Sequence, residues 1–122
     1  MPIKSVGVDI VEIDRIENLL EKYGEKFLKR IFSEKEIAYC SKKKDRGSYA
    51  ARFATKEAVF KATGLGLGKG MTWKDIEVIN DEKGKPSVRL YGKTAEMLNN
   101  TKVHLSISHS RDAAVAMVIV EN

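Results

Sequence analysis

The chain has only one cysteine, Cys40, and no apolar run long enough to cross a membrane. One cysteine excludes an internal disulfide and is compatible with a reducing cytosol, so we expect a cytoplasmic protein. No stretch approaches the roughly 20 apolar residues of a membrane-spanning helix, and no charged-then-apolar leader opens the chain. Aromatic residues make up only 7% of the chain, and none lies in the basic run 42–46. A stacking platform for nucleic-acid bases is therefore poorly supported, and neither nucleic acid nor a membrane is the expected partner.

The composition is otherwise that of a folded globular protein, with 43% hydrophobic and 32% charged residues. A length of 122 residues fits one domain, residues 1–122. Twenty-two Lys and Arg against 17 Asp and Glu give a formal charge of +5, which favours an anionic partner. That partner can be nucleic acid, a phosphorylated cofactor or an acidic protein, and charge alone does not choose among them. The basic run 42–46 is equally explained as a solvated loop.

The periodicity of apolar residues predicts an α/β (α+β) fold, in which strands at both termini meet in one small mixed sheet packed against a long helix. Two capping boxes, at residues 14–17 and 33–36, mark helix starts, and Gly24 and Gly64 are placed to end helices. The predicted strands are residues 3–13, 76–79, 87–91, 103–108 and 113–120, and the predicted helices are 14–23, 27–31, 34–40, 48–63 and 93–99.

Between the long helix and the next strand, glycine occupies every second position from Gly64 to Gly70. Glycines permit positive φ and close backbone approach, so a phosphate cradle is conceivable. Phosphate-binding loops of that kind leave a strand and open a helix, however, whereas this loop leaves a helix. We interpret it as a mobile connector or lid, and not as a nucleotide-binding P-loop.

Two carboxylates lie in otherwise apolar surroundings. Asp9 interrupts a predicted buried strand, and Glu57 lies between Phe53 and Phe60 on the inward arc of the long helix. An ionised carboxylate costs several kcal/mol to bury unless a cation or many hydrogen bonds compensate it. Two such residues in separate elements suggest a shared cation, and hard oxygen ligands of this kind suit magnesium. The alternative is a set of local contacts, such as an ion pair between Glu57 and Lys61.

His109 ends a predicted strand between two serines, where an imidazole can donate to a phosphate or act as an acid or base. A turn histidine bonded to nearby backbone is the alternative. No serine lies in a G-x-S-x-G motif, and one cysteine with two scattered histidines does not make a zinc site.

Residues 6–9 (Val-Gly-Val-Asp) followed, after some forty residues, by 53–62 (Phe-Ala-Thr-Lys-Glu-Ala-Val-Phe-Lys-Ala) resemble the bipartite signature of the phosphopantetheinyl transferases. The segments 70–78, 84–86 and 108–110 are similar to the small bacterial type. The resemblance runs from about residue 6 to the C-terminus. It implies the fold of that family and transfer of 4'-phosphopantetheine from coenzyme A to a serine of apo-acyl carrier protein, with release of adenosine 3',5'-bisphosphate.

For the reacting centre, the resemblance implies that Asp9 and Glu57 hold Mg²⁺, which also binds the pyrophosphate of coenzyme A. Lys61, one turn beyond Glu57, would stabilise the leaving phosphate. Glu57 would take the serine proton, either directly or through a water on the metal.

For the ligands, the resemblance implies that Arg52 and His109, with Lys44, grip the phosphates of coenzyme A and that Pro86 lines the adenine site. Arg15 resembles a contact to the carrier protein, which is acidic and therefore complements the positive charge of this chain. Small members of the family are trimers with active sites between subunits, so a homotrimer is expected.

Two other classes remain as alternatives from the residues alone. One is a non-catalytic basic module that binds nucleic acid or an acidic protein. The other is a magnesium-dependent nuclease that uses the same two carboxylates, although the chain offers no further carboxylate cluster for a second metal.

Overall fold

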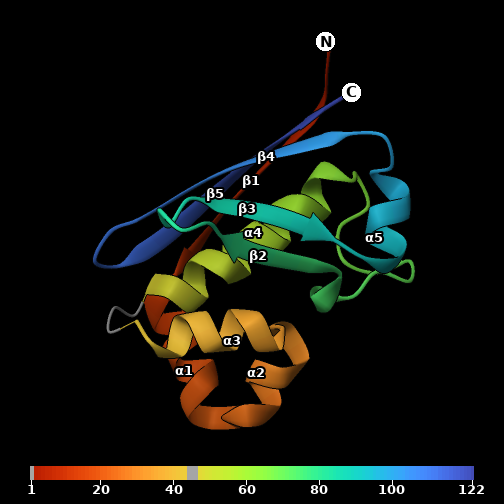
Figure 1. Ribbon diagram of the computed structural model, residues 1–122. Coiled ribbons are helices and arrows are strands. Elements are labelled where there is room, and N and C mark those ends of the chain that lie inside the picture. Colours follow the sequence, from red (N-terminus) through yellow and green to blue (C-terminus); the bar gives the residue numbers. More distant parts are fainter. Residues whose placement is uncertain (1, 44–46) are drawn as a thin grey trace.

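The computed structural model describes residues 2–43 and 47–122. In Figure 1, the long helix α4 lies between a sheet that contains both chain ends and a separate two-stranded hairpin, while three short helices pack at one end. The strands are β1 (Ile3–Glu12), β2 (Ile76–Asn80), β3 (Pro86–Leu90), β4 (Lys102–His109) and β5 (Ala113–Glu121). The helices are α1 (Ile13–Tyr23), α2 (Glu25–Ile31), α3 (Glu34–Ser41), α4 (Gly47–Ala62), the 3₁₀ turn η1 (Trp73–Asp75) and α5 (Gly92–Met97).

The two terminal strands pair, as predicted, and the α/β class is confirmed. The order of the larger sheet is β1-β5-β4, and β2 pairs with β3 in the second sheet. The strand pairing differs from the mixed sheet that we expected, because every pair is antiparallel and the strands form two sheets. Short connections explain the difference: β2 to β3 and β4 to β5 are hairpins, and a hairpin can only be antiparallel.

The larger sheet has one face buried against α4 and one face open. Gly7, Asp9 and Val11 of β1 share the face toward the helix, as the two-residue period requires. Gly7 allows an unusually close approach, since a Cβ at this position would collide with the carbonyl oxygen of Ala58 on α4. The glycine therefore brings the face that carries Asp9 directly onto the helix.

The opposite face of the same sheet is apolar and exposed. Val6, Val8 and Ile10 of β1 are 62%, 56% and 69% exposed, and Met117 of β5, which pairs with Val8, is 47% exposed. Exposed apolar side chains in one contiguous group are typical of a surface that another chain covers.

Helix starts and ends follow local chemistry, with one correction. The capping box at Ser33 and Glu36 is confirmed, and Gly24 ends α1 with φ of 54°. The capping box expected at residues 14–17 is wrong, because α1 already begins at Ile13, with Glu12 as an N-cap without a side-chain hydrogen bond. The amide of Ile13 instead donates to the carbonyl of Asp112 in the β4–β5 turn at 2.9 Å, so tertiary contact satisfies the helix start.

A buried ion pair joins α4 to α3 and β2. Lys56 and Glu36 have fully buried side chains, and Lys56 Nζ lies 2.8 Å from Glu36 Oε1. Lys56 also donates to the carbonyls of Trp73 and Ile76, while Glu36 accepts the amide of Val78 at 3.0 Å. Burial lowers the pKa of Lys56, and the neighbouring Glu36 carboxylate opposes that shift.

The glycine-rich connector leaves α4 as predicted and carries two exposed leucines. Gly64, Gly66, Gly68 and Gly70 all have positive φ, which explains the alternating pattern. Leu65 and Leu67 are about half exposed. Among the described residues, no helix is both long and apolar enough to span a bilayer.

Candidate active site

Asp9 and Lys61 meet across the junction of β1 and α4. Lys61 Nζ lies 2.7 Å from Asp9 Oδ1 and 3.3 Å from the carbonyl oxygen of Val8. The Asp9 side chain is 11% exposed and that of Lys61 is 54% exposed, so the pair lies at the surface with the lysine outermost. The hydrogen bond to Asp9 and the charge of its carboxylate raise the pKa of Lys61. Lys61 thus pairs with Asp9 on the strand, and the local Glu57–Lys61 pair is not the arrangement found.

Glu57 completes this cluster. Partial burial raises the pKa of Glu57, and the nearby negative charge of Asp9 raises it further, while Arg15 and Lys61 act in the opposite direction. Two carboxylates and two cations from three elements therefore interact at one place. The structure brings together Asp9, Glu57, Lys61 and Arg15, which lie up to 52 residues apart in the chain.

The donors at this place fit a magnesium ion. The charge of Asp9 disfavours the ionised form of Glu57, and a cation shared by the two carboxylates would offset that repulsion. Mg²⁺ takes one or two protein carboxylates, with its other ligands from phosphate and water. Within residues 2–43 and 47–122, no group of three or more His, Cys, Asp and Glu side chains could hold a metal without such outside ligands.

Three aromatic rings adjoin the charged cluster: helical spacing placed Phe53 and Phe60 beside Glu57, but no sequence pattern indicated Trp73. Phe53 and Trp73 stack with centroids 4.9 Å apart, and Phe60 meets the edge of Trp73 at 5.5 Å. These three rings line a cavity of about 300 Å³ together with Arg15 and Glu57. Trp73 lies in a predicted loop, so no periodic pattern marked it.

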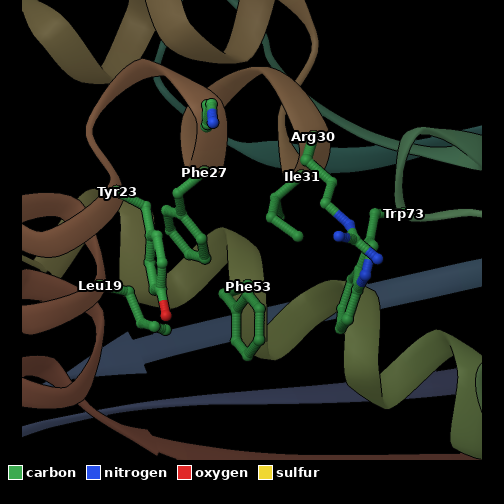
Figure 2. A pocket seen from close by; sticks show the side chains of 8 residues that line it. Leu19, Tyr23, Phe27, Arg30, Ile31, Phe53 and Trp73 are labelled. Carbon is green, nitrogen blue, oxygen red and sulfur yellow. The ribbon is translucent and has the colours of Figure 1, made fainter.

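A second cavity of about 490 Å³ continues from the same two rings, Phe53 and Trp73. Figure 2 shows side chains from α1, α2 and α4 converging on it, with Leu19, Tyr23 and Phe27 on one side. Lys26 and Arg30 also line this cavity. Arg15 lies exposed in the first turn of α1, with its Cζ 5.4 Å from the Phe53 ring centroid, so it borders both the charged cluster and this helical surface.

Arg52, Pro86 and His109 lie together at another place. They line a cavity of about 230 Å³, along with Tyr39 and Asn80. Lys44, which was expected here as well, lies outside the described residues, but its neighbour Lys43 lines the same cavity. The three described residues of the predicted coenzyme A site come from α4, β3 and the end of β4, and only the fold brings them together.

His109 is held against the start of α4. A Cβ on Gly47 would lie 2.7 Å from His109 Nδ1, so the imidazole packs on the bare backbone of this glycine. Any larger residue at position 47 would displace the ring. Gly47 therefore matters to the site, although its place at a helix start did not reveal this from sequence.

The two clusters face different sides of α4. Arg52 and Glu57 are five residues apart on that helix, which corresponds to a rotation of about 140° at 3.6 residues per turn. The cavity at Arg52 and the cavity at Glu57 share no lining residue.

Comparison with known protein families matches residues 5–118 to the 4'-phosphopantetheinyl transferase superfamily. The match covers most of the chain, and the chain belongs to this superfamily. Within it, a relative from Syntrophus aciditrophicus (strain SB) named holo-[acyl-carrier-protein] synthase is 49% identical over 123 residues, covering 98% of this chain and 96% of the relative.

Solved structures agree with this membership. A holo-(acyl-carrier-protein) synthase from Bacillus anthracis str. Ames, in complex with CoA (3',5'-ADP), has a TM-score of 0.83 and 41% identity, covering 98% of this chain and 97% of the other. The Helicobacter pylori holo-[acyl-carrier-protein] synthase in complex with coenzyme A has a TM-score of 0.86 and 37% identity, covering 95% of this chain and 99% of the other.

Proposed function

We propose that this chain transfers 4'-phosphopantetheine from coenzyme A to a serine of apo-acyl carrier protein, and so acts as a holo-[acyl-carrier-protein] synthase. The convergence of Asp9, Glu57 and Lys61 from β1 and α4 carries the proposal. Relatives with that name, and solved relatives in complex with coenzyme A, support it. The whole chain, residues 1–122, would work as one domain.

In this reaction the serine oxygen bonds to the phosphorus that carries the pantetheine arm, and the pyrophosphate bond of coenzyme A breaks. Adenosine 3',5'-bisphosphate leaves with the bridging oxygen. Asp9 and Glu57 would hold Mg²⁺, which, when bound, supplies charge neutralisation and alignment for the pyrophosphate. Lys61 would donate to the leaving phosphate, since its side chain is more than half exposed and its Nζ already lies beside Asp9. Glu57 would take the serine proton, since its carboxylate lies in the same cluster as Asp9 and Lys61.

The nucleotide half of coenzyme A would occupy the cavity at Arg52. Arg52 and His109, with Lys44, would bind phosphate, and Pro86 would lie against the adenine. Arg52 supports this placement because it is only 4% exposed and, among the described residues, forms no ion pair with a carboxylate. A buried cation in that state is stabilised by an anionic ligand.

We further propose a homotrimer in which one coenzyme A contacts two neighbouring chains. The exposed apolar face of β1 and β5 around Val8 and Met117 supports association. The Arg52 and Glu57 cavities lie on different sides of α4, which supports a shared site, because the nucleotide half from one chain can then complement the metal half of the next.

The carrier protein would approach over Arg15 at the start of α1. Acyl carrier proteins are acidic, so the formal charge of +5 should speed their encounter with this chain and make it salt-dependent. A cytoplasmic location is proposed on the single cysteine, Cys40.

The test is to incubate the protein with coenzyme A, magnesium and apo-acyl carrier protein, and to measure the mass of the carrier. A gain of the phosphopantetheine mass is expected, and it should disappear when the carrier serine is replaced by alanine. No gain at any salt concentration would exclude the transferase. Retention of nucleic acid or cleavage of a nucleic-acid substrate would instead favour the binding-module or nuclease alternatives.

The role of Glu57 has its own test. With saturating magnesium, Glu57→Gln should lower turnover by about 100-fold or more, because the amide cannot accept the serine proton. Near-normal turnover under that condition would exclude Glu57 as the base and leave it only as a metal ligand.

A further inference from the structure

Arg52 is held in place by neutral groups. Its Nη2 donates to Asn80 Oδ1, its Nη1 donates to the carbonyl of Ser48 at 3.3 Å, and its Nε has no hydrogen-bond partner in the described part of the chain. The Arg52 side chain is buried, and no described carboxylate forms an ion pair with it. Such an arrangement keeps the cation available for an anion that enters the cavity.

Tyr39 of α3 supports one face of this guanidinium. The Cζ of Arg52 lies 4.3 Å from the centroid of the Tyr39 ring, within the range of a cation–π contact. Lys43 Nζ lies 4.9 Å from the same centroid. One aromatic ring therefore positions two cations that line the same cavity without neutralising either of them.

Asn80 links Arg52 to the turn that carries Pro86. Its Oδ1 accepts from Arg52, while its Nδ2 donates to the carbonyl of Gly84 at 3.0 Å. Asn80 is also the partner of Pro86 in the β2–β3 register. A single side chain thus fixes the relative position of the phosphate-binding and adenine-lining parts of the cavity.

We propose that Tyr39 and Asn80 are positioning residues, which hold the Arg52 guanidinium for the phosphate on the adenosine ribose of coenzyme A. This inference rests on the proposed function. The ribose phosphate is the relevant one because it stays beside the adenine at Pro86, whereas the pyrophosphate belongs at the Asp9 and Glu57 cluster. Both residues reduce the ordering that phosphate binding would otherwise require of a long side chain.

Calorimetric binding of two nucleotides tests this proposal without any transfer reaction. The wild-type protein should bind adenosine 3',5'-bisphosphate roughly 100-fold more tightly than adenosine 5'-monophosphate. Tyr39→Leu and Asn80→Ala should each reduce that preference by about tenfold, through weaker binding of the bisphosphate alone. Tyr39→Phe keeps the ring face and should keep the preference.

Two further comparisons separate positioning from a general structural effect. In an Arg52→Met background, Tyr39→Leu and Asn80→Ala should cause no additional loss of preference, because they act through Arg52. The matched control Asn99→Ala changes an exposed asparagine that does not line this cavity, and it should leave both affinities unchanged.

Two results would overturn the proposal. One is an equal loss of affinity for both nucleotides in the Tyr39 and Asn80 variants. The other is that these substitutions reduce the nucleotide preference as much in the Arg52→Met background as in the wild type. So would a wild-type protein that binds the two nucleotides equally. Failure of the proposed function would give a different result: the carrier protein would gain no mass in the transfer assay, whichever nucleotide the protein prefers. In the transfer assay, the same variants should raise the KM for coenzyme A about tenfold with little change in kcat.

Discussion

Lys56 and Lys61 lie five residues apart on α4, and each faces a carboxylate from another element, but the two pairs differ in their access to solvent. The Lys56–Glu36 pair is fully buried and saturated by backbone carbonyls and amides. The Lys61–Asp9 pair is open, with more than half of the lysine side chain exposed. A saturated buried pair fixes helix position, whereas an open pair beside Glu57 can exchange partners with a ligand. Both lysines lie on the same helix, so it is solvent access that distinguishes the two pairs.

The largest effect is expected at the buried pair. Lys56→Met leaves the Glu36 carboxylate without its cation in the core, which should lower the free energy of unfolding by about 3–5 kcal/mol. Urea unfolding measures it. The double variant Lys56→Met/Glu36→Leu should recover much of the loss, because it removes both charges. If the free energy of unfolding of Lys56→Met lay within about 1 kcal/mol of the wild-type value, the buried pair would contribute no more than an exposed one.

The open pair should behave in the opposite way. Lys61→Met should leave the free energy of unfolding nearly unchanged, since the lysine is exposed to solvent. Turnover should nevertheless fall about 100-fold, because a donor to the leaving phosphate is lost. Lys93→Met, an exposed lysine on α5, is the control and should alter neither quantity. Equal turnover for the two variants would remove Lys61 from the reacting centre.

Glu57 should make stability depend on pH. The pKa of Glu57 is raised in the folded protein, so folding favours the protonated carboxyl. In the absence of metal, the free energy of unfolding of the wild type relative to Glu57→Gln should therefore be highest at pH values below the ordinary glutamate pKa. That advantage should be lost as the pH rises through the raised pKa. With magnesium the trend should reverse, because the metal binds the ionised carboxylate. Unfolding of wild type and Glu57→Gln over a pH series, with and without magnesium, measures both trends.

Asp9 offers a matched control for that series. Its charge is the second cause of the raised Glu57 pKa, so in an Asp9→Asn background the pH-dependent difference should be smaller. A difference that does not change when Asp9 is replaced would mean that the two carboxylates do not interact.

Salt should produce the smallest effect. In a double-mutant cycle, the coupling between Lys61 and Asp9 should be small and should shrink as salt is added, because exposed charges are screened over about 10 Å at 0.1 M. The Lys56–Glu36 coupling should stay unchanged over the same range. If added salt weakened the Lys56–Glu36 coupling as much as the Lys61–Asp9 coupling, the Lys56–Glu36 pair would have to be accessible to ions.

Local patterns predicted most elements of the fold but not all of their junctions. The long helix, the terminal strands and the capping box at Ser33 follow from residue types a few positions apart. The start of α1 was misplaced because Asp112, nearly a hundred residues away, satisfies its first amide. The antiparallel pairing of β2 with β3 and of β4 with β5 was equally a matter of short connections rather than of strand composition.

The candidate site divides in the same manner. The bipartite motif identified Asp9, Glu57 and Lys61, and the structure brings all three together. Tyr39 and Asn80 were missed, because an aromatic residue in a short helix and an asparagine before a turn have common local explanations. Their contacts with Arg52 span 13 and 28 residues, and no local spacing predicts such contacts.

The amino-acid sequence alone determined which chemical groups are present, the helix and strand on which the key carboxylates lie, and the family to which the chain belongs. Tertiary structure decided which charge meets which: Lys61 with Asp9, Lys56 with Glu36, and Arg52 with Asn80. The physical reason is that sequence spacing governs contacts within one or two helical turns. Contacts between elements depend instead on close approaches such as that of Gly7 to α4, which exist only once the chain has packed.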